Sequence, residues 1–262
     1  EGSEPFPGTS EFRFAEPSLS LRPNTQDPTP NTLRERSEPM KLDLGSGPNP
    51  MAGYVGVDRP EDDARPALTT ALASLPCQPH IDARGIIRFD LACGLPWPFE
   101  DESIEGLYSS NLIEHLPCSD VLVYDRWPDA PAPHDALPDG HRYLQRVGTQ
   151  DALLRFMDEA WRVTKPGGQL LLRWPALVDQ DTGEIQIAPF QDPTHRRFIP
   201  LEQVPYWSVA GRDTLGVAQY RARCDWHPVS FAQRKHGTPP RYSLIENEVV
   251  LERRSRKEEK QP

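Results

Sequence analysis

The chain is poor in cysteine, and its cysteines are not spaced as metal ligands. Four occur among 262 residues, at Cys77, Cys93, Cys118 and Cys224. A structural zinc site needs paired cysteines at short spacing, and a small disulfide-stabilised fold needs a denser framework. The sequence therefore favours reduced thiols in an intracellular protein.

Long apolar segments and excess positive charge are also lacking. No run approaches the roughly 20 apolar residues that cross a bilayer, and the first ten residues, EGSEPFPGTS, lack the pattern of a signal peptide. The formal net charge of −10 disfavours general adhesion to nucleic acid or anionic membranes. We expect a cytoplasmic protein without a membrane segment, whose partner is a small molecule rather than a nucleic acid; its oligomeric state is not indicated.

Proline is abundant, with 30 residues, while hydrophobic residues make up 37% of the chain, which predicts a modest core. Residues 1–39 are rich in Pro and Ser and show no apolar period, so we expect a disordered leader. Residues 253–262 carry both basic and acidic side chains and are expected to be a solvated tail. The remaining segment, 40–252, has the length of one domain.

Short apolar runs with long connections follow one another from residue 40 onward. They lie at residues 40–44, 54–57, 86–89, 104–108 and 169–174. This pattern predicts a parallel sheet in an α/β domain. A last strand is expected within RYSLIENEVVLERR, near the end of the domain.

One helix is predicted before the fifth run, starting near Thr149. Its apolar residues recur at helical spacing: Leu153, Phe156, Met157, Ala160 and Trp161. The helix should end at Lys165-Pro166-Gly167-Gly168, because Pro cannot continue it and Gly reverses the chain.

Two segments exceed what such a sheet needs, at about 117–148 and 175–240. Both follow predicted parallel strands, at whose carboxyl ends open α/β sheets bind ligands. We interpret both as insertions on the substrate side.

The strongest local pattern is KLDLGSGPNP at residues 41–50, followed by a second strand that ends at Asp58. Glycines after an apolar strand bring bare backbone close to a ligand. A carboxylate at the next strand end offers the paired acceptors that a ribose diol requires. The pattern predicts a site for a nucleotide-like cofactor.

With FDLACGLPWPFEDESIEGLYSSNLIEHL and RVTKPGG in the same order, the chain resembles a class I S-adenosylmethionine-dependent methyltransferase of the broad type 11 group, with a GPNP first motif and a DPTH loop. The resemblance covers about residues 40–175 and, more weakly, the chain to 251. It implies a Rossmann-like, mainly parallel seven-stranded sheet flanked by helices, with S-adenosylmethionine as cofactor. The cofactor-binding positions that it implies are Asp43, Gly45, Ser46, Gly47, Asp58, Asp90, Leu91 and Asn111.

The chain departs from the family pattern in its first loop. Pro48-Asn49-Pro50 replaces the usual third glycine, and only 13 residues lead from Gly45 to Asp58. A full helix is therefore not expected between the first two strands. A pyrophosphate depends on a helix N-terminus more than a sulfonium cofactor does, so the same feature weighs against a nicotinamide dinucleotide.

Glu114-His115 follows the fourth run, where a general base could reach the transferred methyl group. Some metal-dependent members of the family carry Glu-x-x-Glu-His there, whereas this chain has Asn111 at the first position, and we assign no metal. In an alternative interpretation the pair only caps or orients the following loop.

A second candidate is Asp192-Pro193-Thr194-His195, followed by two arginines. This turn presents a carboxylate, a hydroxyl and an imidazole together, and similar segments resemble an active-site loop in the family. The alternative is a turn that pins the insertion to the domain. The candidate catalytic residues are His115, His195 and Asp192.

The sequence thus predicts methyl transfer from S-adenosylmethionine to an unidentified, small-molecule acceptor. A cofactor-binding or scaffold module without turnover is the alternative from another class. A nucleic-acid methyltransferase or a nicotinamide-dependent oxidoreductase fits less well, because the chain is acidic and no site for a hydride donor is evident.

Overall fold

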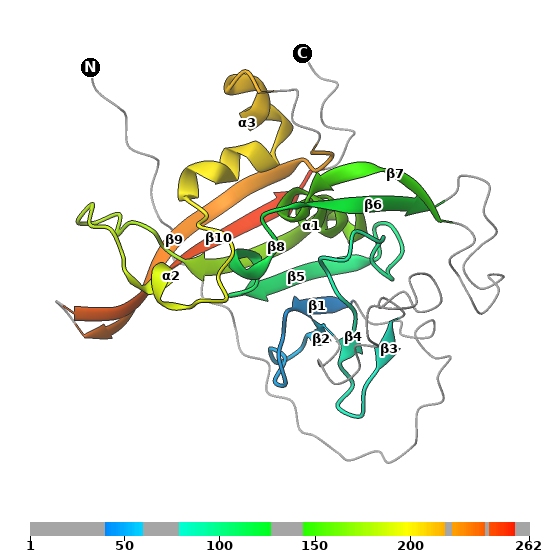
Figure 1. Ribbon diagram of the computed structural model, residues 1–262, viewed down its shortest axis with the longest axis horizontal. Coiled ribbons are helices and arrows are strands. Elements are labelled where there is room, and N and C mark those ends of the chain that lie inside the picture. Colours follow the sequence, from blue (N-terminus) through cyan, green and yellow to red (C-terminus); the bar gives the residue numbers. More distant parts are fainter. Residues whose placement is uncertain (1–39, 60–78, 127–143, 218–221, 239–240, 255–262) are drawn as a thin grey trace. The chain divides into compact units, whose positions relative to one another are not determined.

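A mixed eight-stranded sheet forms the centre of the computed structural model, which describes residues 40–59, 79–126, 144–217, 222–238 and 241–254 (Figure 1). The strand order is β3-β4-β2-β1-β5-β8-β10-β9. The bounds are Lys41–Leu44 (β1), Val55–Asp58 (β2), His80–Ile81 (β3), Ile87–Arg88 (β4), Ile104–Ser110 (β5), Thr164–Pro175 (β8), Trp226–Thr238 (β9) and Arg241–Arg253 (β10). The expected leader, 1–39, and most of the expected tail lie outside the described residues.

The five apolar runs become the parallel strands β4, β2, β1, β5 and β8, as the sequence predicts. Strand β1 lies between β2 and β5, with Leu42 opposite Val55 on one side and Leu107 on the other. Leu42, Leu44 and Leu107 are fully or almost fully buried. Apolar runs of this kind form inner strands because both sheet faces are covered.

Three antiparallel strands complete the sheet and change two expectations. The two-residue strand β3 pairs with β4, so the described sheet has eight strands where seven were expected. Strand β9 pairs along β10 and comes from the segment 175–240, which is therefore not an insertion throughout. The sequence does not predict β9, because Pro228 and polar residues interrupt the alternation of apolar and polar side chains. An edge strand tolerates such interruptions.

The segment after β5 forms a separate two-stranded antiparallel sheet. It consists of β6 (Asp120–Arg126) and β7 (Leu144–Asp151), within and just beyond the expected insertion 117–148. Strand β7 leads directly into helix α1.

Helix α1 spans Ala152–Val163 and begins later than the predicted Thr149, because the preceding residues complete β7. The Asp151 carboxylate caps the helix by accepting hydrogen bonds from the amides of Leu153 and Leu154. The predicted apolar face is buried, and Phe156 packs edge-on against Trp97 with ring centroids 5.2 Å apart. Each such fully buried side chain contributes about 1.5–3 kcal/mol.

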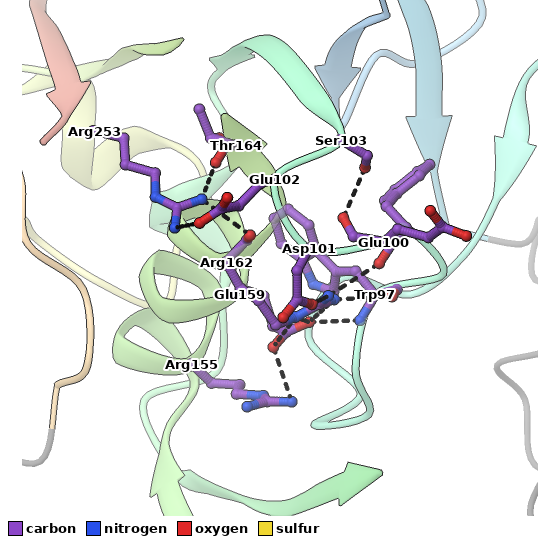
Figure 2. A network of polar contacts seen from close by, with 11 residues as sticks. Trp97, Glu100, Asp101, Glu102, Ser103, Arg155, Glu159, Arg162, Thr164 and Arg253 are labelled. Carbon is purple, nitrogen blue, oxygen red and sulfur yellow. Dashed lines mark hydrogen bonds and ion pairs between the residues drawn. The ribbon is translucent and has the colours of Figure 1, made fainter. Parts of the chain in front are cut away.

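The other face of α1 carries a buried ionic network (Figure 2). Glu159, only 2% exposed, accepts a 2.7 Å hydrogen bond from the Trp97 amide and pairs with Arg155 and Arg162. Arg162 also donates to the carbonyls of Trp97 and Phe99. The network fixes the loop between β4 and β5 to the helix.

The segment predicted to end the helix forms a bulge in strand β8. Thr164 is opposite Ile104 and Gln169 is opposite Gly106, so Lys165-Pro166-Gly167-Gly168 bulges out of β8. Gly167 has a φ of +79°, which glycine adopts readily. The remaining short helices are η3 (Ile113–His115), α2 (Ala188–Gln191), η6 (Leu201–Trp207) and α3 (Val209–Thr214).

Candidate functional site

The strand order creates a switch point between β1 and β5. From β1 the chain builds β2 and β4 on one side, and then β5 and β8 on the other. Loops at the carboxyl ends of β1 and β5 therefore diverge, and in open α/β sheets ligands bind in the crevice that opens there.

The glycine loop after β1 lies at this point and contains no helix, as expected from its prolines. Gly45 and Gly47 have φ angles of +72° and +57°, which other residues adopt only with strain. The Gly45 amide donates a 2.7 Å hydrogen bond to the Val57 carbonyl of β2. A Cβ atom on Gly45 would lie 2.9 Å from Leu112 Cδ1, so the loop packs closely against the segment that follows β5.

Asp43 closes the base of this loop. Its side chain is buried, and Oδ2 accepts a 2.7 Å hydrogen bond from the Met51 amide. Burial raises the pKa of the Asp43 carboxyl above its usual value; the Met51 hydrogen bond opposes this effect, and the charge of Asp58 adds to it.

A cavity of about 360 Å³ opens at the switch point, within the size range of small-molecule sites. Its lining residues are Asp43, Gly45, Ser46, Asn49, Met51, Tyr108 and Ser110. Three of the sequence-predicted cofactor residues, Asp43, Gly45 and Ser46, thus line one cavity.

Asp58 and Asp90 stand at the ends of the next two strands but do not line the cavity. Asp58 Oδ1 accepts a hydrogen bond from the Arg59 amide, and Oδ2 lies 3.9 Å from Arg88 Nη1. Asp90 Oδ1 accepts one from the Ala92 amide, and Leu91 beside it is buried. Both carboxylates lie at or just after the carboxyl ends of parallel strands, β2 for Asp58 and β4 for Asp90.

Asn111, another position expected at the cofactor, lies directly after β5. Its φ is +51°, and its side-chain amide donates a 3.1 Å hydrogen bond to Glu246 Oε1 of β10. Its backbone amide donates to the Arg173 carbonyl of β8. Asn111 therefore turns the chain from β5 toward η3 and holds that turn against the antiparallel part of the sheet.

Glu114 occupies a buried position in η3, with 2% of its surface exposed. Within the described ranges, neither carboxylate oxygen has a hydrogen-bond partner. Burial raises the pKa of Glu114 to about 7, and the charges of Glu246 and Asp192 add to the effect. A polar group in this state costs stability unless a ligand or proton compensates it.

The three predicted catalytic residues lie together beside Glu114. The rings of His115 and His195 are edge-on, with centroids 4.8 Å apart, and Asp192 Oδ2 lies 3.7 Å from His195 Nε2. Asp192 Oδ1 accepts hydrogen bonds from the hydroxyl and amide of Thr194, which lower the Asp192 pKa. Burial is the largest effect on His115 and lowers its pKa, which favours the neutral imidazole.

The loop that carries Asp192 and His195 is docked on η3. The amides of Arg196 and Arg197 both donate to the Glu114 carbonyl, at 2.8 and 3.0 Å. The Arg197 guanidinium pairs with Asp151, which caps α1, and donates to the Leu116 carbonyl. Arg197 thus anchors the loop to the domain through internal contacts, and the same loop brings His195 to His115.

Glu114, His115 and His195 each offer a ligand atom, and these atoms lie within 4.8 Å of one another. The sequence singles out Glu114 together with His115, but nothing local signals that the Glu114 carboxylate is buried. Tyr108 and Ser110 in the cavity wall were not predicted. Their spacing of two residues at a strand end was an available signal, because such residues share one face.

Within the described residues, every helix is too short or too polar to cross a membrane. No family model matches the chain, and no curated protein sequence matches it.

Solved structures similar to the chain include methyltransferases. An S-adenosylmethionine-dependent methyltransferase from Methanosarcina mazei is 12% identical, with a TM-score of 0.41, covering 82% of this chain and 92% of that chain. A Haloferax volcanii complex that contains a methyltransferase activator gives 11% identity, a TM-score of 0.43 and 83% coverage of both chains.

A phosphoethanolamine N-methyltransferase from Haemonchus contortus, in complex with phosphomonomethylethanolamine and S-adenosylhomocysteine, is 11% identical with a TM-score of 0.39. The similarity covers 83% of this chain and 49% of that one. TM-scores near 0.4 are too low to assign an activity to this chain.

Proposed function

We propose that the chain is an S-adenosylmethionine-dependent methyltransferase that acts on a small-molecule acceptor. The observation that carries the proposal is the cavity at the switch point, which is lined by Asp43 and by the backbone of Gly45 and Ser46. A cavity with a carboxylate and bare backbone suits a compact ligand with cationic groups, as the methionine part of this cofactor is.

We divide the candidate residues into two groups. We assign the glycine loop, Asp58 and Asp90 to the cofactor, with the Asp58 carboxylate accepting from the ribose hydroxyls. The first crossover has no helix, so its N-terminal amides and dipole are not available for a pyrophosphate. This feature favours S-adenosylmethionine over a nicotinamide dinucleotide.

We assign His115, His195 and Asp192 to the acceptor. The cofactor supplies an activated methyl group when bound, so the protein has to orient the acceptor and remove its proton. The lowered pKa keeps the His115 ring neutral at physiological pH, in the form that accepts a proton. Asp192 lies beside His195 and places a negative charge next to that ring, which the Pro189 carbonyl orients through Nδ1.

The test is calorimetric titration with S-adenosylhomocysteine. We expect binding to the wild type, and a loss of about tenfold or more in Asp58→Ala, because charge-assisted hydrogen bonds contribute about 1.5–3 kcal/mol. The matched control is Asp213→Ala, which removes an exposed carboxylate from α3 and should leave the affinity unchanged. NAD serves as the competing ligand.

Absence of S-adenosylhomocysteine binding to the wild type would contradict the proposal, as would preferential binding of NAD. If S-adenosylhomocysteine binds, acceptor screening with transfer of a labelled methyl group follows. A cofactor that binds but is never consumed would support a binding module instead.

A further inference from the structure

Glu114, His115 and His195 form a cluster whose arrangement the methyl-transfer proposal does not require. The three ligand atoms come from two segments, η3 and the loop after α2, and lie within 4.8 Å of one another. We propose that this cluster binds one divalent transition-metal ion of the kind that prefers imidazole ligands, such as Zn²⁺.

The two imidazoles are oriented for this role by their other ring nitrogen. His195 Nδ1 lies 2.7 Å from the Pro189 carbonyl oxygen, and His115 Nδ1 lies 3.3 Å from that of Thr194. A carbonyl oxygen only accepts, which places the proton of His195 on Nδ1. The Thr194 hydroxyl lies 3.1 Å from His115 Nδ1, and because it donates its proton to Asp192 Oδ1 it accepts from His115 as the carbonyl does. In this tautomer each Nε2 presents a lone pair. Metal-binding histidines are held in this way, with one nitrogen donating to a carbonyl and the other free for the metal.

Glu114 supplies an independent indication of a cation. Only 2% of the residue is exposed, and its carboxylate oxygens have no hydrogen-bond partner in the described part of the chain. A buried carboxylate without a partner is costly, and a bound cation would offset that cost.

The donor set selects the class of ion. Two imidazoles and one carboxylate suit zinc and its first-row neighbours, whereas Mg²⁺ and Ca²⁺ prefer oxygen ligands alone. Zinc lies about 2.0–2.2 Å from nitrogen and oxygen ligands, so the three atoms have to approach within about 4 Å of one another. Small side-chain rotations accomplish this, and three protein ligands leave a position open for water or an acceptor.

With a metal bound, His115 would no longer accept a proton, because the lone pair on Nε2 would bind the ion. An acceptor hydroxyl bound at the open position would then lose its proton more readily. The proposed ion site itself does not depend on methyl transfer and is measurable without the cofactor.

The experiment is titration of the chelator-treated full chain with Zn²⁺ in the absence of S-adenosylhomocysteine, by competition with a chromophoric chelator. We expect one equivalent to bind, and Glu114→Gln and His195→Asn each to weaken binding by about 100-fold or more, since each removes one of three ligands. His80→Asn, which removes an exposed histidine of β3, is the control and should bind like the wild type. Mg²⁺ at the same concentration should not compete.

Thermal unfolding without metal checks that each variant is folded, and having two ligand variants covers the case in which one does not fold. No Zn²⁺ uptake by the wild type would overturn the proposal, as would equal uptake by both ligand variants or preferential binding of Mg²⁺. Because S-adenosylhomocysteine binding is measured separately, Zn²⁺ uptake without it would contradict the methyltransferase proposal alone.

Discussion

Gly45 and Gly47 have similar backbone angles but different surroundings. Both have positive φ, yet a Cβ atom on Gly47 would meet nothing within 4 Å, whereas one on Gly45 would approach three atoms of Leu112 within 3.1 Å. Backbone strain is therefore shared by the two positions, and the steric conflict belongs to Gly45 alone.

The two alanine substitutions should separate these effects. Gly47→Ala should lower the free energy of unfolding by about 1–2 kcal/mol, the cost of a left-handed residue with a side chain. Gly45→Ala should lower it by about 3 kcal/mol or more, because overpacking against Leu112 adds to the strain. Urea unfolding measures both, and equal losses would show that Leu112 yields without cost.

The buried network on α1 behaves as a unit at the scale of elements (Figure 2). Arg162 contacts Glu159, which is 2% exposed, and also Asp101, whose side chain is 72% exposed. One arginine thus has a buried and a solvent-exposed partner, which provides a matched comparison.

Glu159→Ala should reduce the free energy of unfolding by about 3–5 kcal/mol, because it removes the buried carboxylate that accepts from the Trp97 amide and balances the charge of the neighbouring arginines. Asp101→Ala should reduce it by no more than about 1 kcal/mol, because an exposed ion pair is weak. Chemical unfolding curves give both values. A small loss in Glu159→Ala would mean that water replaces the carboxylate in the network.

The elements that the sequence predicts well are those encoded by local periodicity. The five parallel strands and α1 follow from apolar spacing, and the end of α1 follows from Pro166 and the two glycines after it. Strand β9 was not recognised, because its partner β10 supplies the pairing and one exposed edge needs no apolar alternation. Tertiary pairing of this kind leaves little trace in a single segment.

Within the candidate site, the motifs predict which residues lie together better than they predict their environment. His115 and the pair Asp192 and His195 belong to two separate candidate motifs, and the structure brings them together although they come from segments far apart in the chain. The loop whose amides donate to the backbone carbonyl of Glu114 packs against this residue, and the charge of Glu246 raises the pKa of its carboxyl. Neither contribution is visible in the sequence around Glu114.

At the scale of the whole molecule, Arg253 joins the last strand to three earlier parts of the chain. Its guanidinium lies 4.2 Å from the centre of the Trp161 ring, and it donates to the carbonyls of Arg162 and Thr164 and to Glu102 Oε1. These contacts attach the end of β10 to α1 and to the turn before β5.

Arg253→Met retains much of the apolar stem but removes these donors, and should lower the free energy of unfolding by about 2–4 kcal/mol. Arg254→Met is the neighbouring control and should change it by no more than about 0.5 kcal/mol, because Arg254 is exposed. Differential scanning calorimetry of both variants checks the comparison. Equal transition temperatures of the two variants would show that the contacts of Arg253 do not stabilise the fold.

The close contact between Gly45 and Leu112 joins the glycine loop to the segment that carries the proposed ion site. Leu112 immediately precedes η3, which carries Glu114 and His115, and no space remains between its side chain and the glycine loop. A shift of either segment therefore displaces the other. Thermodynamic reciprocity then fixes the relation between the ligands: the factor by which the ion changes the affinity for the cofactor equals the factor by which the cofactor changes the affinity for the ion.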